Sequence, residues 1–145
     1  MEHKLSTPHE SAQSLMNLYE LRRDEKLREA RTWVVRSFNP KSVEDFAALT
    51  QTEEYTYFRM VSSYWDMAAS FVVHGAIDAE MFRSVSGEML ASYCKVNHII
   101  DEVRESTGQT GLFKHVEEVA ADWPGAEERM GMMREYFWGL AAAND

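Results

Sequence analysis

Apolar residues recur at intervals of three and four along almost the whole chain, and no segment alternates with a period of two. This spacing predicts amphipathic α-helices and no β-sheet. The first helix is expected to begin at Thr7-Pro8, because threonine is a good N-cap, proline suits the first helical position and Glu10 completes a capping box. It is expected to run to about Phe38, since the residue before Pro40 resists the helical conformation. The middle of this segment, residues 22–26, carries no apolar stripe.

Five further helices follow from the same pattern and from the capping residues at their ends. Short connections between helices favour antiparallel neighbours. We therefore predict a single all-α domain over residues 1–145, an antiparallel bundle of about six helices, four long and two short, with residues 1–7 as a flexible N-terminus. The expected helices are 42–50 (begun by Ser42), 52–75 (ended by Gly75), 79–106 (begun by Asp78 and closed by Gly108), 110–123 and 126–142.

Composition narrows the classes of function. The net charge of −9 comes without a basic block, and the pair Arg22-Arg23 lies in a mixed run that is expected to be a solvated helix face. Nucleic-acid binding needs clustered basic side chains, so it is not expected. The longest uncharged apolar stretch, residues 67–77, is shorter than the ~20 residues of a membrane span. With a polar N-terminus and a single cysteine, Cys94, these features predict a cytoplasmic protein with no membrane contact.

Asp66 is an acid in the middle of an apolar helical segment, residues 53–74. At ~100° per residue it falls on a polar seam with Arg59, Ser63, Ser70 and His74, away from the expected core side. A lone buried carboxylate would be very costly, so Asp66 needs a partner from this seam or from a facing helix. His74 points ~80° away and is not expected to be that partner. We favour a structural role for Asp66.

Other histidines could in principle bind a metal. His98 and Glu102 have i, i+4 spacing, but His98 lies opposite the expected buried stripe and should be exposed. His115 and Glu118 have i, i+3 spacing. The chain has no Glu-x-x-His, His-Glu-x-x-His, Cys-x-x-Cys or glycine-rich phosphate loop. We therefore predict no metal, no cofactor and no catalytic residue.

Three segments, residues 25–36, 64–80 and 111–120, resemble a family of uncharacterised bacterial helical proteins known only as a domain of unknown function. The resemblance implies an all-helical fold and a bacterial origin, with no established activity. Some such relatives carry an N-terminal membrane segment, whereas this chain begins with polar residues. The family pattern has an acid within the apolar helix that precedes a Gly-apolar-Asp turn, and Asp66 stands at the matching position. If this acid is functional, the resemblance points to Asp66 with Arg59 or Arg31. The matching positions are Ala30-Arg31, Asp66, Gly75 to Asp78, and Phe113 with Glu117 or Glu118.

Several large apolar residues fall outside the expected core stripes, and they indicate a second burial surface. That surface could belong to another helix of the bundle or to a second subunit. We expect a non-enzymatic helical bundle that acts through protein–protein contact or self-association, most simply as a homodimer. The alternative is a small-ligand or metal-binding bundle with a Met- and aromatic-lined pocket and Asp66, Arg59 and His115 as polar contacts. The residues outside the stripes are Met60, Met67, Phe71, Met132, Tyr136 and Trp138.

Overall fold

A computed structural model describes residues 5–144 of the chain. Within that range there are nine α-helices, one 3-10 turn and no strand, so the all-α prediction is confirmed and the count of about six helices is wrong. The elements are α1 (Pro8–Leu21), α2 (Glu25–Arg36), α3 (Val43–Leu49), α4 (Tyr55–Val73), α5 (Ala79–Val85), α6 (Gly87–Tyr93), η1 (Asn97–Ile99), α7 (Ile100–Thr107), α8 (Lys114–Ala121) and α9 (Ala126–Ala143).

The first expected helix is divided because Asp24 begins a new one. The Asp24 carboxylate accepts the backbone N–H of Leu27 at 3.0 Å, which is the geometry of an N-cap. The preceding residues, which lack an apolar stripe, form the turn between α1 and α2. From that turn α2 takes its own direction and buries Leu27, Ala30 and Val34.

The long helix expected over residues 79–106 is also divided, at Ser86 and again after Tyr93. The second break coincides with five consecutive buried residues, Ser92 to Val96. A continuous helix with one buried face cannot hide five residues in a row, because they point in all directions around its axis. The chain resolves this conflict by leaving the α-helical conformation.

The predicted helix ends are largely confirmed. Thr7 and Glu10 form the capping box of α1, and Ser42 and Asp78 cap α3 and α5. Glycines 75, 108 and 125 have positive φ at helix ends. The helix expected from residue 110 begins only at Lys114.

The expected flexible segment 1–7 lies partly outside the described residues. Within the described part, the Ser6 N–H donates to the Gly75 carbonyl at 3.0 Å.

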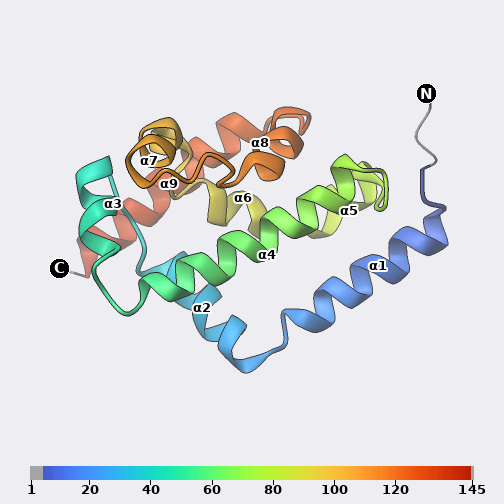
Figure 1. Ribbon diagram of the computed structural model, residues 1–145, viewed down its shortest axis with the longest axis horizontal. Coiled ribbons are helices and arrows are strands. Elements are labelled where there is room, and N and C mark those ends of the chain that lie inside the picture. Colours follow the sequence, from blue (N-terminus) through green and yellow to red (C-terminus); the bar gives the residue numbers. More distant parts are fainter. Residues whose placement is uncertain (1–4, 145) are drawn as a thin grey trace.

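Helix α4 runs through the middle of the molecule, with α1 and α2 along one side and α6, α8 and α9 along the other (Figure 1). The core beside it is aromatic: the Phe58 ring of α4 lies 4.8 Å from Phe38, 5.5 Å from Phe46 and 6.0 Å from Phe113. None of the described helices combines the length and the apolarity that a membrane span requires.

Lys95 is a cation inside this core, with a relative exposure of only 1%. Its Nζ donates to the Val35 carbonyl and to Asn39 Oδ1, both at 2.7 Å, and lies 3.8 Å from the centre of the Phe137 ring. Among the described residues no carboxylate forms an ion pair with it. Burial therefore lowers the pKa of Lys95 from 10.5 to about 8.

This lowered pKa predicts a pH-dependent stability. Between pH 8 and 10.5 the unfolded chain keeps a proton that folded Lys95 has released, so the free energy of unfolding rises with pH across that window. Relative to a Lys95→Met variant, the wild type should gain of the order of 3 kcal/mol over the window, at ~1.4 kcal/mol per pKa unit. Urea unfolding at a series of pH values measures this difference.

The matched control is Lys26→Met, whose side chain is 73% exposed. Its unfolding free energy should run parallel to that of the wild type at every pH. Cys94 also titrates near this window and its pKa depends on the charge of Lys95, so all three proteins carry Cys94→Ala to remove its contribution. Parallel curves for the wild type and Lys95→Met would contradict the assignment.

Candidate functional site

The first turn of α8 needs a hydrogen-bond acceptor that its own N-cap residue cannot provide. That residue is Phe113, which adopts a left-handed backbone with φ 57° and ψ 23°. Its side chain has no acceptor and is 1% exposed, packed 5.3 Å from the Tyr93 ring and 6.0 Å from the Phe58 ring. Burial of the ring holds this residue in a conformation that non-glycine residues rarely adopt.

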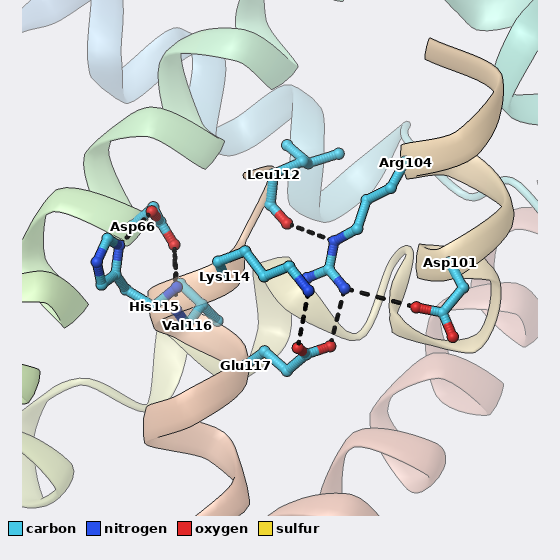
Figure 2. A network of polar contacts seen from close by, with 8 residues as sticks. All are labelled: Asp66, Asp101, Arg104, Leu112, Lys114, His115, Val116 and Glu117. Carbon is cyan, nitrogen blue, oxygen red and sulfur yellow. Dashed lines mark hydrogen bonds and ion pairs between the residues drawn. The ribbon is translucent and has the colours of Figure 1, made fainter. Parts of the chain in front are cut away.

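Asp66 of α4 supplies the missing acceptor from across the interface (Figure 2). Its Oδ1 accepts the backbone N–H groups of His115 at 2.9 Å and of Val116 at 3.1 Å. Its Oδ2 lies 2.9 Å from Nδ1 of the His115 ring, which donates because a carboxylate only accepts. A negative group at a helix N-terminus also interacts favourably with the helix dipole.

The predicted site residues are therefore only partly brought together. Asp66 finds its partner on a facing helix, His115, and neither Arg59 nor Arg31 forms a hydrogen bond or ion pair with it. Arg59 and Asp66 both line a cleft of about 610 Å³ between α4 and residues 109–113. The His74 ring lies 6.1 Å from the His115 ring.

A second polar network fixes the loop that precedes α8. Arg104 of α7 is 6% exposed; its Nε donates to the Leu112 carbonyl at 2.9 Å and its guanidinium donates to Glu117 at 3.0 Å (Figure 2). The same guanidinium lies 3.6 Å from the exposed carboxylate of Asp101. Glu117, one of the positions in the resemblance, therefore holds α8 to α7.

A third cluster was missed at the sequence level. Glu88 of α6 accepts two hydrogen bonds from Arg31 of α2, at 2.7 and 2.8 Å, and lies 3.6 Å from Arg22. The hydrogen bond to Glu88 raises the pKa of Arg31. The side chain of Arg22 is only 18% exposed, so the expectation of a solvated position is wrong for this residue. Only the Ala30-Arg31 match pointed to this cluster, and nothing in the sequence paired Glu88 with it.

His98 is half-buried, which corrects the expectation of an exposed histidine. Its ring lies 5.4 Å from the Trp138 ring. Burial, followed by the charge of Arg134, lowers the pKa of His98. Within residues 5–144, no three histidine, cysteine, aspartate or glutamate side chains are grouped closely enough to hold a metal ion.

The capping role of Asp66 can be tested with Asp66→Ala. This change leaves the N–H groups of His115 and Val116 without an acceptor, and it should lower the free energy of unfolding by about 1–3 kcal/mol. Urea unfolding is the measurement. Ser63→Ala is the control, since Ser63 is exposed on the same seam and donates only to the Met60 carbonyl of its own helix. Equal stabilities of the two variants would show that the cap is unimportant.

Comparison with known proteins gives one match. The model of a domain of unknown function, DUF4760, matches residues 8–123, which is most of the chain and includes Arg31, Asp66 and Glu117. No curated protein and no solved structure matches the chain. The chain belongs to the DUF4760 family.

Proposed function

We propose that this protein is a non-enzymatic helical module that acts through protein–protein contact, first by self-association into a homodimer. The observation that carries the proposal is an apolar surface that we call the α1–α4 face, formed by Leu21, Met60, Met67 and Phe71. Leu21 is 52% exposed, Met67 38% and Phe71 36%. Leu21, Met60 and Met67 line one shallow furrow of about 880 Å³, and Phe71 follows Met67 by one turn on α4.

The charges at the edge of this face suit a second copy of the same chain. Glu20, Arg23 and Asp24 line the furrow beside its apolar residues. In a two-fold dimer the same patch meets itself, so acids of one chain can face the arginine of the other. Such pairing would offset the repulsion between two chains of net charge −9. The cytoplasmic location expected from the sequence forms part of this proposal.

The alternative function, binding of a small ligand by Asp66, Arg59 and His115, has weaker support. Both oxygens of Asp66 already accept hydrogen bonds from α8. In the described part of the chain, the Arg59 side chain forms no hydrogen bond or ion pair, so it is the one charged group of that cleft available to a ligand.

Size-exclusion chromatography with light scattering tests the self-association. We expect the wild type at micromolar concentration to have the mass of two 16.7 kDa chains. The double variant Met67→Glu/Phe71→Glu should be a monomer, because burying two carboxylates in an apolar interface costs several kcal/mol. Both substitutions are at exposed positions and should leave the helical circular dichroism unchanged.

Met132→Glu is the matched control, at a position of α9 that is 68% exposed. It should remain a dimer. A monomeric wild type would refute the self-association. Dissociation by Met132→Glu, with the double variant still dimeric, would instead place the interface on α9 and refute the α1–α4 face.

A further inference from the structure

Helix α1 covers an apolar groove of about 400 Å³ together with α4 and α5. This groove lies on a different side of α1 from the furrow of the α1–α4 face, and the two share only Glu20 and Tyr64. Its volume falls within the range of cavities that take small organic ligands, ~300–1,000 Å³. Its walls include Leu15, Met16, Tyr19, Trp65, Phe82 and Val85.

Two buried N–H donors at this groove have no acceptor. They are Nε1 of Trp65 and Nε of Arg22, and both residues line the groove. Trp65 is 2% exposed, and the Arg22 guanidinium lies 5.4 Å from its ring. A buried donor without an acceptor costs about 1–3 kcal/mol, so the protein gains stability from any bound group that accepts from either nitrogen.

The charge near these donors is positive. Glu88 faces two guanidinium groups, and its short hydrogen bonds, at 2.7 and 2.8 Å, go to Arg31. Arg22 has only the longer contact with Glu88, at 3.6 Å. The other acid lining the groove, Glu20, is 72% exposed and pairs with Arg23. One positive charge at the groove is therefore not closely neutralised.

We propose that this groove binds an apolar carboxylic acid, with its chain between α1 and α5 and its carboxylate accepting from Trp65 Nε1 and Arg22 Nε. The apolar wall selects an alkyl chain, and the two donors with the excess positive charge select an anionic acceptor over a neutral one. This site goes beyond self-association and does not depend on it.

Entry of the ligand requires a small outward movement of α1, because neither nitrogen reaches solvent. Few contacts oppose that movement. α1 buries only Ser11 and Leu18; Ser11 Oγ accepts the Asp78 N–H at 2.9 Å, and the Tyr64 hydroxyl donates to the Leu18 carbonyl at 2.8 Å. A helix with so few buried residues is typical of segments that open locally at low cost.

Isothermal titration calorimetry with decanoate and with decanol tests the site. Decanoate should bind one molecule per chain, and decanol, which has the same chain length and no charge, should bind at least 10-fold more weakly. Equal affinity for the two compounds, or no binding of decanoate, would overturn the proposal. The stoichiometry per chain is independent of dimer formation, so this result and the test of self-association can fail separately.

The variant Trp65→Phe removes the indole N–H but keeps an aromatic ring, so it distinguishes the contribution of the hydrogen bond from that of the apolar wall. It should weaken decanoate about 10-fold and decanol by a smaller factor, because a neutral hydroxyl accepts a weaker hydrogen bond than a carboxylate does; retained decanol binding also shows that the groove is still formed. Met16→Glu, at an exposed residue of the groove, should weaken both compounds, whereas Met132→Glu on α9 should affect neither. Unchanged decanoate binding in Trp65→Phe, or equal losses for Met16→Glu and Met132→Glu, would place the ligand elsewhere.

Discussion

The first turn of α8 carries N–H groups that its own N-cap residue cannot satisfy, and the packing of α4 against α8 depends on how Asp66 satisfies them. Phe113 occupies the cap position but is needed in the core, where its ring contacts Phe58 and Tyr93. One residue cannot both fill the core and cap the helix. The chain divides these tasks between Phe113 and an acid 47 positions earlier, so the cap exists only when α4 and α8 are already packed together.

The secondary structure could be predicted where a local signal existed. Thr7, Ser42 and Asp78 were identified as caps because their spacing to the next helical N–H is encoded within a few residues. The breaks at Asp24 and after Tyr93 were missed for different reasons. At Asp24 the absence of an apolar stripe is visible in the sequence, but a solvated stretch within one continuous helix has the same pattern. After Tyr93 the break follows from five successive buried residues, Ser92 to Val96, and their burial is a property of the tertiary fold.

For the polar sites, too, the position of a residue on its helix could be predicted from the sequence, whereas its partner on another helix could not. The helical wheel placed Asp66 on a polar seam and required a partner on that seam or on a facing helix, which the structure provides in His115 and Val116. Periodicity alone could not identify the partner, because pairs such as Arg31 with Glu88 are 57 positions apart and depend on how the helices meet. The burial of Lys95 could not be predicted for the same reason. The residues next to it in the sequence do not reveal that the Val35 carbonyl and Asn39 Oδ1 accept hydrogen bonds from its Nζ.

The two sides of α4 differ in how their helices are held to it. On the α8 side, Asp66 accepts three hydrogen bonds, and Arg104 donates to a carbonyl and a carboxylate although its Nη2 has no acceptor. On the α1 side, Trp65 and Arg22 each keep a donor without an acceptor, beside a helix that buries two residues. Unsatisfied donors cost stability, and well-packed interfaces usually eliminate them. On the α1 side two such donors lie close together beside a helix with few buried residues, so α1 can leave this side of α4 at a lower cost than α8 can leave the other.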